Sequence, residues 1–460
     1  MSEPRPLSPF EHLLFRDQRP GFPMCFFLHC HVEGALDTDR LRAALREASL
    51  RHPLLRSRVR DSWWRPSWRA PDVEPLLEIV RRADSGAGPR PGEGPWRPID
   101  VRRTSGLRMV AIESSPDEWQ VVLMIQHAVC DGLAGFEFFG DVWSCYHGAA
   151  PAPFRAPSRT VRRPAPAAPT APPEAAVGTG GQTLGETTRF ARFVPAALVR
   201  GPADAPAPAT PDGFPFQPRW IDRQRSHALK ERAAAAGVSV NDIVVAAVMR
   251  AALRWNEAAG RPSRRVRVTM PASLKPAGTR AAARVDMGYA FLDRGVEECR
   301  DPAVLVRSIG MASRWIQEHR AAEVFLDTLA LVDRVPPAMR VVTRIPLPMS
   351  TAVVSYVGNV GPRMKISAER DGGADLPGGL RILGMSGVPP IRPGTRLAVG
   401  VVIYDGRICL TTLCDTRALG SAAAVILPGL VRDEVEACTL GLADVGRDGW
   451  RERADAAVEP

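Results

Sequence analysis

The chain has 460 residues, of which 45% are hydrophobic and 24% charged. This balance is that of ordinary globular proteins with two or more domains, and it excludes a disordered chain, a collagen or a coiled coil as a description of the whole. The net charge of +10 raises nucleic acid as a partner, but only three of the 60 basic residues are lysines and the arginines are spread along the chain. Because no nucleic-acid-binding motif accompanies them, we expect no nucleic-acid partner and attribute the arginine excess to a GC-rich coding genome.

The first half of the chain reads as alternating strands and helices. Apolar runs predict strands at residues 24–32, 107–113 and 119–126. Asp37 is placed to cap a helix whose apolar stripe recurs at helical spacing, in Leu41, Ala44, Leu45 and Ala48. A further aromatic-rich helix is expected over residues 133–146.

A break in composition separates the two halves. Residues 151–173 carry eight prolines, and a stretch rich in glycine and threonine follows. Neither a helix nor a central strand can run through such a segment. The sequence therefore predicts a first domain over 1–150, a crossover linker over 151–189 and a second domain over 190–450.

The second half also alternates predicted helices and strands. A helix over residues 223–236 is expected to stop at Gly237, and Ser239 with Asp242 has the spacing of a capping box at the start of a long apolar helix. Asp405-Gly406 predicts a hairpin. Strands are expected at 266–271, 288–292, 352–357, 397–404 and 408–414. Interleaved strands and helices in both halves predict an α/β or α+β fold with mixed sheets.

His127 and Asp131 follow the apolar strand that ends at Gln126. A histidine where a buried strand opens into a loop can face a cavity as a general base, and an aspartate four residues later can fix the turn. The pattern alone leaves a structural histidine as the alternative.

Six segments follow one another along the chain: residues 6–15, 34–59, 126–132, 238–254, 353–362 and 397–415. In this order they resemble the chloramphenicol acetyltransferase-like superfamily, and within it the wax ester synthase/diacylglycerol acyltransferase branch and the condensation domains. Gln126–Gly132 resembles the active-site motif HHxxxDG of that superfamily. The resemblance implies two acetyltransferase-like lobes, with an active-site tunnel between them.

The resemblance also implies roles for individual residues. His127 would be the general base and Asp131, the second catalytic-motif residue, would organise its loop. Gln126, which replaces the first motif histidine, and Gly132, whose N–H would face an oxyanion, are expected to bind substrate. Asn241, Asp242 and Ser355 are expected to shape the acyl pocket. Helix capping for the Asn-Asp pair and a backbone bond for Ser355 remain open as structural alternatives. The sequence Ser-Tyr-Val-Gly-Asn at 355–359 departs from the usual Ser-Asn-Val-Pro-Gly.

The implied reaction transfers an acyl group from a thioester to a hydroxyl acceptor, with no cofactor. Our first hypothesis is an O-acyltransferase using acyl-CoA and a long-chain alcohol or diacylglycerol. Its alternatives are a free-standing condensation-like enzyme that takes its acyl group from an acyl carrier protein in secondary metabolism, and a degenerate member that binds lipid or a partner without turnover.

Two groups of residues bear on metal binding and on membrane contact. His29 and His31 flank Cys30 without a further ligand at metal spacing, so no metal is expected. The eight cysteines form no Cys-x-x-Cys pair, and no signal peptide or long apolar run is found, which favours a cytoplasmic location. Trp63, Trp64 and Trp68, interleaved with arginines, fit either a sheet edge or a peripheral contact with the inner membrane face or a lipid droplet.

Overall fold

The computed structural model describes residues 5–81, 92–156, 193–201, 214–276, 278–345, 348–365, 374–376 and 379–442. Most of the predicted linker, residues 157–189, and the end of the predicted second domain, residues 443–450, lie outside these ranges.

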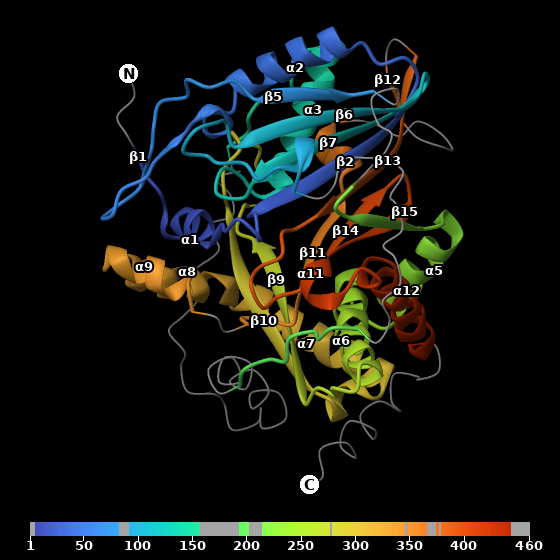
Figure 1. Ribbon diagram of the computed structural model, residues 1–460. Helices are drawn as coiled ribbons and strands as arrows, with labels where there is room; N and C mark the ends of the chain where they lie inside the picture. The colour runs from blue at the N-terminus through green and yellow to red at the C-terminus, as the bar shows by residue number, and fades with distance from the viewer. Residues whose placement is uncertain are drawn as a thin grey trace.

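The first part of the chain builds one layer of helices on a sheet (Figure 1). Its elements are β1 (Arg5–Pro6), α1 (Pro9–Asp17), β2 (Cys25–Glu33), α2 (Thr38–Leu50), β3 (Val59–Arg60), β4 (Ser67–Trp68), β5 (Leu76–Val80), β6 (Leu107–Ser115), β7 (Glu118–Gln126) and α3 (Gly132–Tyr146), with 3₁₀ turns at Pro53–Arg56 and Gly94–Trp96. The strands and helices predicted for this part are all present, and Asp37 caps α2 by accepting from the N–H groups of Asp39 and Arg40.

The second part is richer in helices than its sequence pattern predicts. Its elements are β8 (Gln217–Ile221), α5 (Arg223–Ala235), α6 (Val240–Ala258), β9 (Arg265–Ser273), β10 (Met287–Gly295), a 3₁₀ turn (Glu297–Cys299), α7 (Pro302–Glu318), α8 (Ala321–Asp333), α9 (Pro336–Val342), β11 (Ala352–Asn359), α10 (Gly361–Met364), β12 (Ala374–Leu376), β13 (Leu380–Val388), β14 (Leu397–Tyr404), β15 (Arg407–Cys414), α11 (Thr416–Leu419) and α12 (Ala423–Gly441). The predicted capping box of Ser239 and Asp242 is confirmed, as is the hairpin, in which Asp405 and Gly406 both have positive φ.

The strands form two mixed six-stranded sheets, as the expected fold class requires. The first has the order β12-β13-β2-β7-β6-β5 and is antiparallel except for the parallel pair β5 and β6. The second has the order β10-β9-β11-β14-β15-β8, in which β11 runs parallel to both β9 and β14. A small sheet, β1-β4-β3, stands beside the first. Among the described residues no single helix is long and apolar enough to span a bilayer, and only α5 with α6, bent by 100°, passes as a pair.

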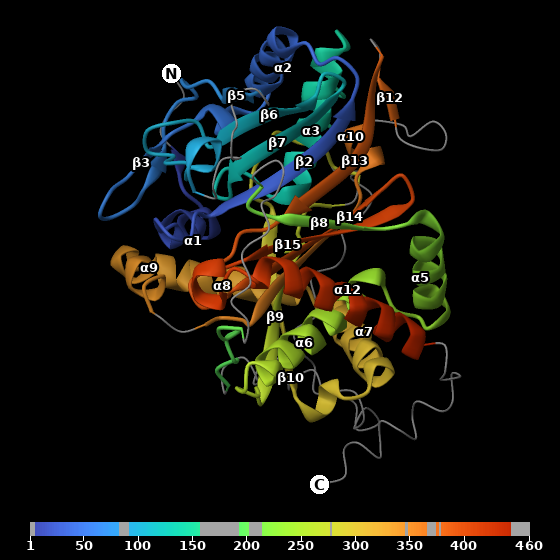
Figure 2. The ribbon, with the colours of Figure 1, turned by 45° about the vertical axis from the view of Figure 1, so that its right-hand side comes forward.

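The sheets exchange strands across the predicted domain boundary. β13 pairs antiparallel with β2, from Arg381 opposite Glu33 to Val388 opposite Phe27, so the first sheet contains strands that lie more than 200 residues beyond position 150. β13 thus reaches from the second half into the first sheet (Figure 2). The ranges 1–150 and 190–450 therefore do not divide the two sheets cleanly.

The close approach of β13 and β14 requires glycine. A Cβ on Gly400 of β14 would overlap the carbonyl oxygen of Gly387 in β13 and crowd the Cα of Val388. Since the obstacle is backbone rather than the end of a flexible side chain, the two strands can only cross here while residue 400 lacks a side chain.

We expect Gly400→Ala to lower the free energy of unfolding by about 1–3 kcal/mol, because the added methyl group forces the two strands apart. The measurement is the apparent melting temperature followed by circular dichroism. Gly429→Ala in α12 is the matched control, since a Cβ there meets no atom within 4 Å. That change should leave stability equal or slightly higher. Equal melting of wild type and Gly400→Ala would contradict the tight crossing.

Candidate active site

His127 stands directly after β7, where the first sheet opens toward the second. The strand ends with Gln126 opposite Cys25, and the backbone N–H of His127 donates to the Met24 carbonyl at 2.7 Å. His127 is 5% exposed, and the centroid of its imidazole lies 4.9 Å from that of the Phe26 ring. Backbone and ring packing therefore hold the side chain in one place.

The hydrogen bond made by the ring defines its tautomer. Nδ1 of His127 lies 3.1 Å from the carbonyl oxygen of Cys130. Because a carbonyl oxygen only accepts, Nδ1 carries the proton and Nε2 keeps its lone pair. Burial lowers the pKa of His127 to about 4, despite the opposing effect of the Cys130 bond. At neutral pH the imidazole is therefore uncharged and ready to accept a proton at Nε2.

Two cavities meet at His127, and both also contact Pro271 and Pro389. The first has polar groups among its walls and is lined by Met24, His127, Thr269, Pro271, Tyr289, Phe291, Met349, Ser350, Val353, Pro389, Pro390 and Arg392. The second has fewer polar side chains and is lined by Phe26, Leu28, His127, Gly132, Phe136, Pro271, Met287, Ser355, Val357, Gly387, Val388, Pro389 and Gly400. His127 thus faces two mostly apolar cavities drawn from both sheets, of which the first carries more polar side chains in its walls.

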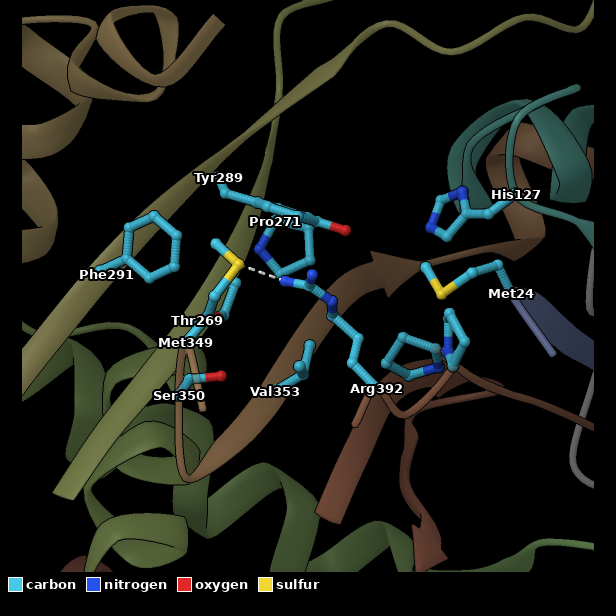
Figure 3. Close-up of a pocket in the computed structure, with 12 residues that line it drawn as sticks. Met24, His127, Thr269, Pro271, Tyr289, Phe291, Met349, Ser350, Val353 and Arg392 are labelled. Atoms are coloured by element: carbon cyan, nitrogen blue, oxygen red, sulfur yellow. Dashed lines mark hydrogen bonds between the residues drawn. The ribbon is translucent and has the colours of Figure 1, made fainter. Parts of the chain in front are cut away.

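Tyr289 and Arg392, which the sequence analysis did not single out, give the first cavity its polarity. Figure 3 shows the Tyr289 hydroxyl pointing from β10 toward the His127 ring across the cavity. Burial raises the pKa of Tyr289 to about 12, so the hydroxyl stays protonated and can donate. Asp17 of α1 holds Arg392 in a two-pronged ion pair: Nε of Arg392 lies 2.5 Å from one carboxylate oxygen of Asp17, and a terminal nitrogen lies 3.1 Å from the other. Arg392 also contacts Met349.

Asp131 joins the histidine loop to the other half of the chain. Its Oδ1 accepts from the Ala134 N–H at 2.9 Å and caps α3, while its Oδ2 accepts from the Asp286 N–H, also at 2.9 Å. Its own N–H donates to the Arg284 carbonyl. Burial raises the pKa of Asp131. These bonds fit the loop-organising role expected of it, and the ring nitrogen Nδ1 of His127 bonds Cys130 instead.

Gln126, expected to bind substrate, lines neither of the two cavities. Its Oε1 accepts from the Ala128 N–H at 2.8 Å, and its Nε2 donates to Oε1 of Gln18 at 3.2 Å. The side chain is fully buried. In place of the first motif histidine, glutamine therefore ties the loop to the segment after α1.

The remaining expected site residues divide into two groups. Gly132 and Ser355 line the second cavity, and a Cβ on Gly132 would enter open space. Asn241 and Asp242 line neither cavity. The amide of Asn241 lies 3.5 Å from the sulfur of Met270, and Asp242 accepts from the Ser239 N–H at 2.8 Å. Helix capping thus accounts for the contacts of Asp242. An effect of Asn241 on substrate would have to pass through Met270 to Pro271, which lines both cavities.

The histidines beside Cys30 have partners other than a metal. His29 bonds Gln120 at 2.6 Å and Ser386 at 3.1 Å, and His31 bonds Glu118 at 2.6 Å. In the part of the chain that the structure describes, no three His, Cys, Asp or Glu side chains gather as metal ligands would.

Curated relatives give a limited match. No family model matches the chain. Two proteins of Mycobacterium tuberculosis, from strains CDC 1551 and H37Rv and both described as uncharacterized, are 26% identical to it over 258 residues. The match covers 54% of this chain and 57% of each relative, so it spans only a little more than half of their length.

Solved structures match over nearly the whole chain. The first condensation domain of the CDA synthetase is 16% identical, with a TM-score of 0.59 over 95% of this chain and 97% of its own. The starter condensation domain of rhizomide synthetase, in complex with C8-CoA and Leu-SNAC, is 14% identical, with a TM-score of 0.59 over 96% and 94%. An epimerization domain of tyrocidine synthetase B is 12% identical, with a TM-score of 0.57 over 97% and 99%.

At these identities the likeness concerns the fold. It confirms the two-lobe architecture expected from the motif order, while the resemblance to the wax ester synthase branch stays a prediction. The chain has the two-lobed fold of condensation domains.

Proposed function

We propose that the protein transfers an acyl group from a thioester to a hydroxyl acceptor, with His127 as the general base. One observation carries the proposal: an uncharged imidazole presents Nε2 where an apolar cavity meets a second cavity that has several polar side chains in its walls. The fold alone cannot carry it, because an epimerization domain shares that fold.

In the proposed reaction, Nε2 of His127 takes the proton from the acceptor hydroxyl as its oxygen attacks the thioester carbonyl. The carbon–oxygen bond forms, the carbon–sulfur bond breaks, and the imidazolium returns the proton to the departing thiolate. The low pKa of the imidazole disfavours a long-lived imidazolium, so the proton passes on promptly to the more basic thiolate. We assign the Gly132 N–H as a donor to the developing oxyanion and the Tyr289 hydroxyl as a donor to the acceptor.

The two cavities suit different parts of the substrates. The walls of the second cavity, such as Phe136 and Val388, suit a hydrocarbon chain. The first cavity offers Tyr289, Thr269 and Arg392, which suit the hydroxyl end of an acceptor and the ester groups of a diacylglycerol. We therefore assign the acyl chain to the second cavity and the acceptor to the first.

Acyl-CoA is the donor in our first proposal, with a long-chain alcohol or diacylglycerol as acceptor, as in wax ester synthases. The segments of the Asn-Asp helix and the Ser355 strand support this branch. The second candidate is an acyl carrier protein as donor in secondary metabolism, which the condensation-domain neighbours favour. In a non-catalytic member the base would be lost or blocked. The bonds of Gln126 support turnover, because they leave Nε2 of His127 free to face the cavities.

The test is product detection by mass spectrometry. Purified protein is incubated with acyl-CoA thioesters of graded chain length and with a mixture of long-chain alcohols and diacylglycerol. Ester formation with release of free CoA supports the first proposal. If only acyl carrier protein thioesters react, the second candidate replaces it. If neither class of donor reacts with any hydroxyl or amine acceptor, acyl transfer by this chain is contradicted.

The pH dependence of the reaction should follow the lowered pKa of His127. The base form of a histidine exists above its pKa, so a pKa near 4 keeps the imidazole competent down to about pH 5, where an ordinary histidine would be mostly protonated. We expect kcat/KM to be nearly level between about pH 5 and pH 8 and to fall only near pH 4. Circular dichroism at each pH controls for unfolding. A half-maximum near pH 6.5 in folded protein would contradict this environment.

A further inference from the structure

One edge of the molecule exposes large apolar side chains from two separate segments. Trp63 and Trp64, in the turn between β3 and β4, are 68% and 61% exposed. At α9 and just beyond it, Val341 and Ile345 are 63% and 47% exposed. The β3–β4 hairpin and α9 lie side by side at the same edge in both views (Figures 1 and 2). Trp68, by contrast, is buried, so sheet-edge packing explains that tryptophan alone.

Arg340 fastens the hairpin to α9. Its guanidinium carbon lies 5.0 Å from the centroid of the Trp63 ring, in cation–π geometry. It also donates to the Ser62 carbonyl at 3.2 Å and approaches Asp61 at 3.3 Å. The two apolar segments are therefore one surface, which we call the tryptophan edge: Trp63, Trp64, Val341 and Ile345.

A cationic pocket opens beside the tryptophan edge. Four guanidinium groups, from Arg16, Arg102, Arg340 and Arg344, face only two carboxylates among its described lining residues. The Nε of Arg340 is buried without a hydrogen-bond partner in the described part of the chain. The excess of positive charge among the lining residues favours an anion with several oxygens.

We propose that the tryptophan edge and the cationic pocket dock the protein on an anionic phospholipid surface, with a headgroup phosphate in the pocket. Arginine forks match phosphate oxygens, and tryptophan prefers the boundary between lipid headgroups and acyl chains. A soluble anion would account for the pocket but not for two tryptophans at a hairpin tip and the aliphatic residues of α9. This inference is independent of the acyl transfer proposed above.

The experiment is sedimentation of the full chain with vesicles. Wild type should sediment with vesicles of phosphatidylglycerol and phosphatidylcholine in equal parts, and far less with phosphatidylcholine alone. We expect Arg340→Gln with Arg344→Gln, and separately Val341→Ser with Ile345→Ser, to lower the partition coefficient about tenfold or more. The apparent melting temperature checks that each variant is folded.

Matched controls use exposed residues elsewhere. Arg225→Gln with Arg432→Gln removes the same charge, and Val425→Ser with Leu440→Ser on α12 removes comparable exposed apolar surface. Both should bind within about twofold of wild type, since long-range charge falls off within about a Debye length.

Three results would overturn the proposal. The first is no sedimentation with either vesicle, and the second is equal loss in the control variants. The third is a soluble occupant: CoA, pyrophosphate or an acidic carrier protein binding wild type and not the Arg340/Arg344 variant, while vesicles remain unbound. None of these readouts depends on acyl transfer, so failure of the proposed function would leave the result intact.

Discussion

Replacing His127 by alanine is expected to lower kcat by about 10²–10⁴-fold, the range that general-base catalysis usually supplies. The imidazole is the base at the junction of the two cavities, while the walls that hold the substrates remain in place. A residual rate from proximity should therefore persist. The measurement is the initial rate with the thioester donor found by product detection. Because the change removes one buried ring and one hydrogen bond, the apparent melting temperature should fall by only a few degrees.

Gln126→Ala is the matched control for His127→Ala, one residue away. It removes the acceptor for the Ala128 N–H and the bond to Gln18, so it leaves a buried donor unpaired and should lower the free energy of unfolding by about 1–3 kcal/mol. Since Gln126 lines neither cavity, its effect on kcat should stay below about tenfold. Equal turnover by wild type and well-folded His127→Ala would exclude the general-base assignment.

Local patterns predicted the local structure well. The apolar runs around β2, β6 and β7, the Asp37 cap and the Asp405-Gly406 hairpin are all set by neighbours within a few residues. The same is true of the loop from Gln126 to Gly132, which forms because a buried strand must end before α3 can begin. Its position between the sheets was implied by motif order.

Long-range pairing could not be read from the chain. β13 contains two glycines, which weaken its strand pattern, and it pairs with β2 across about 350 residues. Nothing in the sequence of β13 indicates which strand it pairs with. The polar side chains of the first cavity could not be predicted for the same reason. Tyr289 sits on an ordinary strand, and Arg392 acquires its meaning only from Asp17, which lies 375 residues earlier. Asp242 shows the reverse case, in which a local capping signal explains a motif residue better than the distant pocket does.

Variants of Asp131 can test whether this residue positions the His127 loop or acts on the substrate. Its two carboxylate oxygens each accept one backbone N–H, one from α3 and one from the segment before β10. The carbonyl that orients His127 belongs to the preceding residue, Cys130. Loosening Asp131 should therefore shift the imidazole without removing it.

We expect Asp131→Ala to lower the free energy of unfolding by about 2–4 kcal/mol, from a lost helix cap and an unpaired buried N–H, and to lower kcat about tenfold or more through the displaced His127. Asp131→Asn keeps one acceptor and should fall between wild type and alanine in both properties. Asp37→Ala is the control, because it removes a comparable cap from α2, far from the cavities, and should lower stability by about 1 kcal/mol without changing kcat. Melting temperatures and initial rates of the three variants decide the matter: if Asp131→Ala were as stable as Asp37→Ala yet as inactive as His127→Ala, Asp131 would act on the substrate directly.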